Sequence, residues 1–489
     1  MLQFFEWYYP ADGSLWNQLK KEASSLKERG IDAIWLPPAH KGSKGIQSEG
    51  YDSYDLYDLG EFDQKGTVKT KFGTKEELLN AVDACKKAGL NIISDIVLNH
   101  LGGADEVETI TARKVNSNNR NEYISDPYEI EAYTKFTYPG RKGKYSQFIW
   151  DFQCFSGIDY DNKNKENGIF TIQNQYGEGW EDGVSSENGN YDYLMFSDIE
   201  FRNPNVVEEL NRWGLWLYNT IKFDGMRLDA IKHINPQFFN EWLDFMRKET
   251  GKELFTVGEY WDPYNISTLL EYIDATQGRM SLFDAPLHLN LHTASRSGKN
   301  YDLTTIFHNS LVNAKPDLAV TIVENHDTQP LQSLEQPVEP WFKGISYSLI
   351  LLREKGYPCI FYADLYGAKY KDKGGDGNEY EVVIEKCFEL ELLLQIRKKL
   401  SYGTQRDYFD HANCIGWTRE GVDEYEKSGC AIVISNSEDG YKKMEIGKKH
   451  VGKNFIDAMK KHEEKIAINE DGWAEFKVKA GSVSVWILE

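Results

Sequence analysis

Short apolar runs alternate with amphipathic stretches from the start of the chain to about residue 395. The runs at residues 31–37 and 91–97 are rich in Ile and lack strict polar and apolar alternation, which is typical of buried parallel strands. Apolar residues at helical spacing are found over residues 16–29, 75–87 and 206–219. Asn203 and Pro204 supply a helix-start signal before the last of these. The alternation of strands and helices predicts a parallel α/β sheet.

Eight strand candidates can be placed in this part of the chain. They are residues 2–8, 31–37, 91–99, 223–229, 254–259, 280–284, 319–326 and 358–362. Eight parallel strands, each followed by a helix, predict a closed (β/α)₈ TIM barrel. In such a barrel the catalytic groups lie at the C-terminal ends of the strands.

Two segments depart from the alternation. Residues 100–202 are rich in Gly, Asn, Asp, Tyr and Trp and lack long helical periodicity, which predicts a β-rich insertion after the third strand. After about residue 396 the pattern changes to short strands of antiparallel type, which predicts a C-terminal β-sandwich. We therefore expect a catalytic barrel over residues 1–99 and 203–395, an insertion over 100–202 and a sandwich domain over 396–489.

Residues 374–377, three of them Gly, are expected to form a loop, since they lack the strand-to-helix context of a phosphate cradle.

Composition narrows the range of partners. The 489 residues carry a formal net charge of −21, which disfavours nucleic acid and anionic membrane surfaces. Aromatic residues make up 13%, including 13 Trp and 29 Tyr, so some are available as flat platforms for sugar rings. No apolar run approaches the length of a spanning helix. A neutral or cationic ligand fits this charge better, and we expect a monomer.

The N-terminus and the cysteines bear on location. The chain begins with a strand-like run and lacks a basic leader and a small-residue cleavage site. Its six cysteines are scattered, without close pairs or metal-ligand spacing, and are expected to be free thiols. Both features favour a cytoplasmic protein; the alternative is a secreted protein whose leader has been removed.

Acidic residues stand at the ends of three predicted strands. In a strand, side chains two residues apart share a face, so Arg227 and Asp229 are expected to point the same way. The arginine would hold the acid ionised and aimed, which suits it to be a nucleophile. Glu259 and Asp327 follow two further apolar runs. Most of the 77 acids must lie at the surface, but we predict that these three form one site at the mouth of the barrel.

Four segments around these acids resemble a known family. They read DIVLNH at residues 95–100, GMRLDAIKH at 225–233, GEYW at 258–261 and VENHD at 323–327. In residue types, order and spacing they resemble the α-amylase family of glycoside hydrolases, glycoside hydrolase family 13. Further agreement at residues 50–62, 188–195 and 327–330 makes the chain most similar to the bacterial liquefying and cytoplasmic α-amylases, over essentially its whole length.

The resemblance implies an endo-acting, retaining hydrolysis of internal α-1,4-glucosidic bonds in starch, glycogen and maltodextrins. It makes Asp229 the nucleophile that forms a covalent glycosyl intermediate, and Glu259 the acid/base, with a pKa raised by burial and nearby negative charge. Asp327 would grip sugar hydroxyls and favour the distorted ring. The implied sugar contacts are Tyr51, His100, Arg227, Lys232, His233, Trp261 and His326.

A calcium ion is also implied by the resemblance. Its oxygen ligands would be Asn99, Asp192, Asp198 and the backbone oxygen of His233, which join the barrel to the insertion. Some relatives in the liquefying group carry a further metal cluster nearby, with aspartates where this chain has Ser156 and Glu181, so we do not expect that cluster here.

Two alternative functions stay open. The same acids support glucanotransfer when a sugar outcompetes water, and such a relative can also lose catalysis and act as a carbohydrate-binding or scaffold protein. A separate expectation concerns Glu324, two residues before His326. If the strand is regular, Glu324 shares a face with His326 and tunes the charge of the site.

Overall fold

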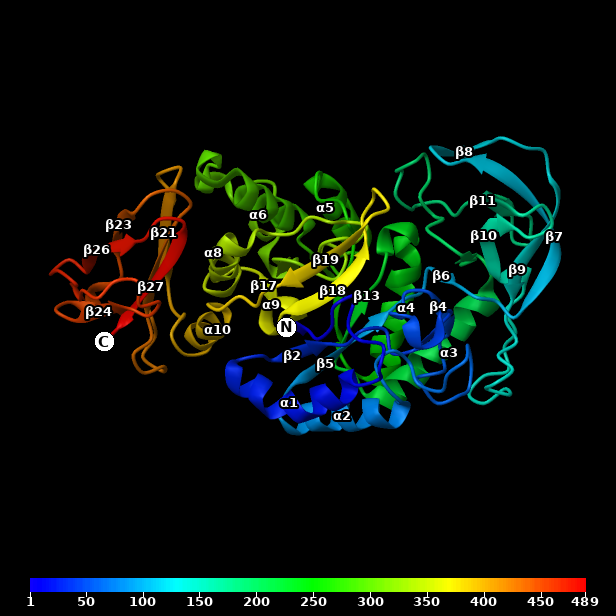
Figure 1. Cartoon of the computed structure of the whole chain (residues 1–489), viewed down its shortest axis with the longest axis horizontal. Coiled ribbons are helices and arrows are strands. Elements are labelled where there is room, and N and C mark those ends of the chain that lie inside the picture. The colour runs from blue at the N-terminus through cyan, green and yellow to red at the C-terminus, as the bar shows by residue number, and fades with distance from the viewer.

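Eight parallel strands form a closed barrel at the centre of the molecule (Figure 1). The computed structural model describes residues 1–489. A parallel bridge between Leu2 and Ile360 joins the first strand to the end of the last and closes the ring. The barrel strands, in hydrogen-bonded order, are β1 Leu2–Gln3, β2 Ala33–Trp35, β5 Asn91–Ile96, β13 Gly225–Leu228, β14 Phe255–Gly258, β15 Ser281–Phe283, β16 Ala319–Ile322 and β17 Tyr357–Cys359. The predicted TIM barrel is confirmed, although each strand is shorter than expected.

Helices cover the outside of the barrel (Figure 1). Asn203 caps the helix that follows it, because its side chain accepts a hydrogen bond from Asn205 N and Pro204 takes the first helical position. This confirms the predicted start signal. The helices are α1 Leu15–Arg29, α2 Lys75–Lys87, α3 Pro204–Ile221, α4 Pro236–Thr250, α5 Ile266–Ala275, α6 Ala285–Ser297, α7 Leu311–Ala314, α8 Pro340–Leu351, α9 Tyr362–Tyr366 and α10 Leu390–Lys399.

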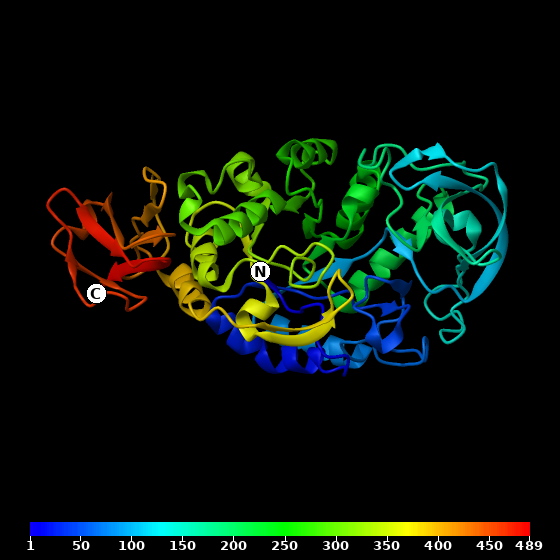
Figure 2. The same ribbon diagram turned by 45° about the horizontal axis from the view of Figure 1, so that its top comes forward.

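A separate antiparallel sheet lies between β5 and α3. Its strands are β6 His100–Leu101, β7 Glu106–Asn116, β8 Asn119–Tyr123, β9 Tyr128–Lys135, β10 Phe155–Asp161, β11 Glu166–Ile172 and β12 Ser197–Ile199. Its first strand, β6, pairs with its last, β12, so that His100 lies opposite Asp198. The sheet therefore begins and ends at the mouth of the barrel, and Figure 2 shows it at one end of the elongated molecule.

The C-terminal sheets lie at the other end of the molecule (Figure 2). They begin after α10, so the predicted boundary at residue 396 lies inside this helix. A six-stranded sheet contains β20 Gln405–Tyr408, β21 Cys414–Arg419, β22 Cys430–Ser435, β27 Ser482–Leu488, β24 Asn454–Asp457 and β25 Ile466–Ala467, and a pair contains β23 Gly440–Glu445 and β26 Trp473–Val478. This is the predicted antiparallel C-terminal fold.

Two features near the barrel mouth were not predicted. Short strands β3 Lys41–Gly42 and β4 Ser53–Asp55 pair with each other after β2. A hairpin of β18 Ala368–Lys373 and β19 Glu379–Ile384 follows α9, and the expected loop at Gly374–Gly377 is its tip. All six cysteines are free and buried. None of the helices combines the length and the apolar character that a membrane-spanning segment needs.

Candidate active site

Three carboxylates meet at the C-terminal mouth of the barrel. Asp229 directly follows the end of β13, and Glu259 directly follows the end of β14. Asp327 lies on the loop after β16. All three line one cavity of about 410 Å³. The structure therefore brings together acids that are nearly 100 positions apart in the chain, as the barrel geometry predicts.

Arg227 lies beneath the cavity and joins the acids. Its Nη1 donates to Asp229 Oδ1 at 2.6 Å and to Asp95 Oδ1 at 3.0 Å. Its Nη2 donates to Glu259 Oε2 at 2.7 Å. The arginine side chain is only 1% exposed, so water does not screen these ion pairs and their geometry is fixed. Arg227 and Asp229 point to the same side of β13, but Arg227 does not line the cavity.

Asp95 is a site residue that the sequence reasoning missed. Its Oδ2 accepts hydrogen bonds from Trp35 Nε1 at 2.9 Å and from the Tyr51 hydroxyl at 2.8 Å, while its Oδ1 binds Arg227. Burial raises the pKa of Asp95 to about 6. The signal was available, because Asp95 opens the first of the four family-like segments. Its contacts orient Arg227 and Tyr51 from below.

Glu259 and Asp327 have higher pKa values than surface carboxylates. Burial, reinforced by the charge of Asp229, raises the pKa of Glu259 to about 7 against the opposing effect of Arg227. Burial and the nearby Glu259 raise the pKa of Asp327 well above its ordinary value. Glu259 therefore carries a proton over much of the neutral and acidic range, as a general acid requires.

Three histidines line the cavity, and all have a lowered pKa because they are buried. The His100 ring is hydrogen-bonded to Tyr51 O at 2.8 Å, and the His233 ring to Tyr191 O at 2.6 Å. Gln3 Nε2 lies 3.1 Å from His326 Nδ1. If the amide donates there, the proton of His326 is on Nε2, which lies 3.4 Å from Asp327 Oδ2. In neutral His100 and His233 the single ring proton is donated to a carbonyl oxygen, so the other ring nitrogen can accept a hydrogen bond from a sugar hydroxyl.

Aromatic rings form one wall of the cavity. The Tyr51 ring stacks on His326 at 4.8 Å between centroids and on Trp7 at 6.0 Å. Trp7 was not predicted as a site residue, because it stands in a strand-like run near the N-terminus, outside the four family-like segments. Trp261 lines the cavity from the loop after β14. Flat rings of this kind suit the apolar faces of sugars.

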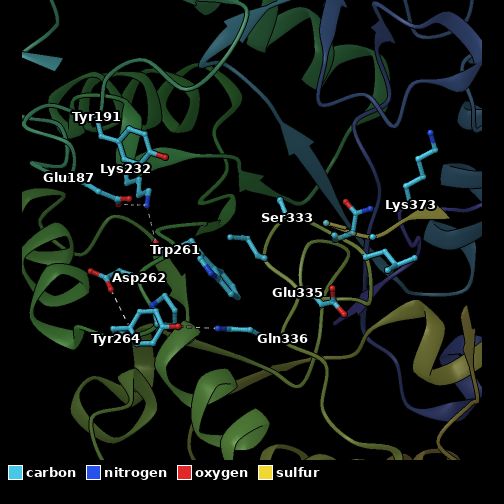
Figure 3. Close-up of a pocket in the computed structure, with 16 residues that line it drawn as sticks. Glu187, Tyr191, Lys232, Trp261, Asp262, Tyr264, Ser333, Glu335, Gln336 and Lys373 are labelled. Atoms are coloured by element: carbon cyan, nitrogen blue, oxygen red, sulfur yellow. Dashed lines mark hydrogen bonds and ion pairs between the residues drawn. The ribbon is translucent and has the colours of Figure 1, made fainter. Parts of the chain in front are cut away.

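Lys232 lies at the rim. Its Nζ donates to Glu187 Oε2 at 2.9 Å and to Trp261 O at 3.2 Å, and the side chain extends beside Tyr191 (Figure 3). The 3₁₀ turn Ile231–His233 that carries it starts after Ala230, whose φ of 51° is left-handed. This turn directs Lys232 and His233 to the side of Asp229. Of the predicted sugar contacts, only Arg227 lies outside the cavity lining.

The predicted calcium ligands lie between the barrel and the insertion. Asn99 Nδ2 donates to Asp198 Oδ1 at 3.1 Å, and Ser156 Oγ donates to Asp198 Oδ2 at 2.6 Å. Asp192 accepts from Glu181 N at 2.9 Å. The His233 ring bonds to Tyr191 O, which precedes Asp192. Asn99, on the segment after β5, is thus joined to Asp198 on β12, while Asp192 lies on the loop before β12.

The donor set fits a calcium ion in chemistry. Burial raises the pKa of both Asp192 and Asp198 well above the ordinary value, and the charges of Glu181 and Glu200 beside Asp192 and of Asp192 beside Asp198 add to this effect. A bound cation would stabilise the ionised forms of both acids. Nearby, Oε2 of Glu181 is buried without a hydrogen-bond partner. No group of three or more His, Cys, Asp or Glu side chains is placed to hold a metal ion. Any calcium here would take its other ligands from amide oxygens, backbone oxygens and water.

Glu324 does not share the site, contrary to the expectation. The strand β16 ends at Ile322, so the regular alternation that would align Glu324 with His326 is lost. Glu324 instead accepts from Val338 N at 2.6 Å and from Lys343 Nζ at 3.1 Å. It is a buried support that fixes the end of the loop carrying Asp327.

Two family models match the chain. One described as "Alpha amylase, catalytic domain" matches residues 21–420, and one described as "Alpha-amylase C-terminal" matches residues 431–487. Together they extend over the barrel apart from β1 and the start of α1, over the insertion and over most of the C-terminal sheets.

Known proteins are similar over the whole chain. "Cytoplasmic alpha-amylase" of Escherichia coli (strain K12) is 49% identical over 100% of this chain and 98% of its own length. "Alpha-amylase" of Geobacillus stearothermophilus is 49% identical over 100% of this chain and 86% of its own length. A crystal structure of an α-amylase from Geobacillus thermoleovorans, complexed with acarbose, has a TM-score of 0.62 at 18% identity and covers 97% of this chain and 92% of the other.

Proposed function

Because this chain belongs to the α-amylase family and is itself an α-amylase that hydrolyses starch-like glucans, we propose that it is endo-acting and retaining. It cleaves internal α-1,4-glucosidic bonds in starch, glycogen and maltodextrins through a covalent intermediate on Asp229. The neutral glucan suits a protein whose formal net charge is −21.

The shared contact with Arg227 carries this proposal. A single guanidinium binds Asp229 at 2.6 Å and Glu259 at 2.7 Å, which keeps the two acids close. Retaining glycosidases use a separation of about 5 to 5.5 Å, whereas inverting enzymes need about 6.5 to 9.5 Å to admit a water. Two carboxylates bound to one guanidinium suit the shorter separation, which favours direct attack by a carboxylate.

The steps follow from the positions of the acids. Asp229 attacks the anomeric carbon while the bond to the glycosidic oxygen breaks, and Glu259 gives its proton to that departing oxygen. Water then attacks the glycosyl ester, Glu259 takes the proton of the water, and Asp229 leaves. Asp327, with His326, binds sugar hydroxyls and favours the flattened ring of the transition state.

Product stereochemistry tests the proposal. Proton NMR during hydrolysis of maltoheptaose should show the α-anomer at newly formed reducing ends before mutarotation sets in. Asp229→Asn should lose activity by several orders of magnitude while its far-ultraviolet circular dichroism stays that of the parent. First formation of the β-anomer, or an Asn variant with parental activity, would refute the mechanism.

We further propose one bound calcium at Asn99, Asp192, Asp198 and the backbone oxygen of His233, where it would neutralise the buried acids. A cytoplasmic monomer fits the free, buried cysteines and the similarity to the cytoplasmic enzyme of Escherichia coli.

A further inference from the structure

A larger recess adjoins the catalytic cavity on one side. Its volume is about 970 Å³, and it shares Tyr191, Lys232, Trp261, Ser333 and Leu334 with the cavity. The wall formed by Tyr51, His100 and His326 does not line it. The recess therefore continues the cleft in one direction only, past Trp261 and Lys232.

The ring of Tyr264 stands in this recess with unusual exposure. The residue is 78% exposed, the most exposed large hydrophobic side chain in the protein. Burial in the protein therefore does not account for its position, and a large aromatic ring left in solvent beside a substrate cleft is available for a ligand.

The backbone under this ring is firmly anchored. Asp262 Oδ1 accepts from Tyr264 N at 3.2 Å and from Asn265 N at 3.1 Å, and Asp262 Oδ2 accepts from Thr268 Oγ1 at 2.9 Å. Pro263 restricts the backbone between them. The ring is thus exposed on a preorganised turn, so little conformational entropy is lost when a ligand stacks on it.

Gln336 braces the ring from the facing loop. Its Nε2 donates to the Tyr264 hydroxyl at 3.3 Å, which links the loop after β14 to the loop after β16 (Figure 3). The rest of the lining is rich in hydrogen-bonding groups, including Gln332, Glu335 and Lys373. A flat ring among hydroxyl-binding side chains is the recognition chemistry of a glucose unit.

We propose that Tyr264, braced by Gln336, is a distal glucose-binding position on the leaving-group side of the cleft. This rests on the proposed function, in which Glu259 protonates the departing oxygen, and on the family resemblance, which implies that Lys232 and His233 contact the sugars on the reducing-end side. The recess begins at Lys232 and Trp261, so it receives the continuation of that chain. Tyr264 then sets how strongly the enzyme prefers long substrates and which bond it cleaves.

Chain-length kinetics test the proposal. For the parent and Tyr264→Ala, kcat/KM is measured on maltotriose through maltoheptaose, together with bond-cleavage frequencies on oligosaccharides labelled at the reducing end. We expect Tyr264→Ala to lose about tenfold in kcat/KM on maltoheptaose, the value of one stacking contact, and to keep the parental rate on maltotriose. Cleavage should shift toward shorter leaving groups. Tyr264→Trp should keep the length preference.

A matched control is Tyr441→Ala, which removes a ring that is 58% exposed on β23, far from the cleft. It should change neither measurement. An equal loss on every chain length in Tyr264→Ala, or no loss on maltoheptaose, would overturn the proposal. A parent without activity on any α-1,4-glucan would instead overturn the proposed function, and the two failures are therefore distinguishable.

Discussion

Arg227 sets the electrostatics of the site at the scale of single residues. One buried guanidinium binds Asp95, Asp229 and Glu259, so three carboxylates can be held near one another with one full positive charge among them. Arg227 lowers the pKa of Glu259, but burial and Asp229 raise it more, and the result is about 7. Glu259 is therefore poised to donate and to accept a proton near neutral pH.

The pKa of Glu259 predicts the alkaline limit of activity. Below pH about 7 the residue holds the proton that the departing oxygen needs; above it that proton is lost, and kcat/KM on soluble starch should fall about tenfold per pH unit. The profile is measured from pH 5 to 9 at constant ionic strength. Glu259→Gln should lower kcat by roughly 10² to 10⁴-fold.

The leaving group provides the control for this prediction. An α-maltosyl fluoride departs with little need for a proton, so the alkaline fall in its kcat/KM should weaken or vanish. An alkaline limb that is the same for starch and for the fluoride would show that some group other than the general acid causes it.

Individual helices can be tested at their capped ends. Asn203 is buried, and its side chain caps α3 through Asn205 N and donates to Gln153 O at 3.0 Å. Asn203→Ala should cost about 2 to 3 kcal/mol of unfolding free energy, from the lost cap and from a buried carbonyl left without a donor. Urea unfolding measures this. Asn118→Ala, in an exposed turn, is the control and should stay within about 0.5 kcal/mol.

The elements of the barrel were predictable because each obeys a local rule. The eight barrel strands are largely buried and lie within the apolar runs that the pattern indicates, and α3 starts at its Asn-Pro signal. The missed elements lack that pattern. The strand Ala368–Lys373 has one buried residue, Tyr370, which stacks on Tyr8 at 3.9 Å, and a contact across more than 360 residues leaves no periodicity in the sequence.

The candidate site was predictable where a motif marks it and unpredictable where only the fold does. Asp229, Glu259 and Asp327 end apolar runs, so their convergence follows from barrel geometry. Trp7 and Tyr264 reach the cleft through loop conformation alone. The prediction for Glu324 was wrong because side chains alternate between faces only within a strand, and β16 ends two residues before Glu324.

The proposed calcium site lies between the insertion and the barrel. We therefore predict that calcium stabilises the folded protein. Calcium binds the folded protein, so saturating calcium at about 100 times its Kd should add about 2.7 kcal/mol of stability. Removal by a chelator should lower the Tm measured by calorimetry. Asp198→Asn, which removes one buried charge, should bind calcium weakly and show a much smaller chelator effect. A parental Tm that changes neither with added calcium nor with chelator would refute the site.

At the scale of the whole molecule, the C-terminal sheets share a core with the barrel. In β22, Ile432 and Ile434 belong to the barrel's core cluster, whereas Ala431 and Val433 belong to the small core with β23 and β26. Alternate residues of one strand thus face two different cores, which explains why all of β22 is buried.

Trp417 on β21 makes this connection testable. It is fully buried in the barrel's core cluster, and its Nε1 donates to Leu352 O at 3.3 Å, just beyond α8. Trp417→Ala should cost about 3 to 5 kcal/mol, as large-to-small changes in a core do. Because the core is shared, calorimetry should show the parent unfolding in one cooperative transition, with the variant shifted as a whole to lower temperature. A C-terminal transition that moves alone, with the barrel transition unchanged, would show that the sheets fold as an independent unit.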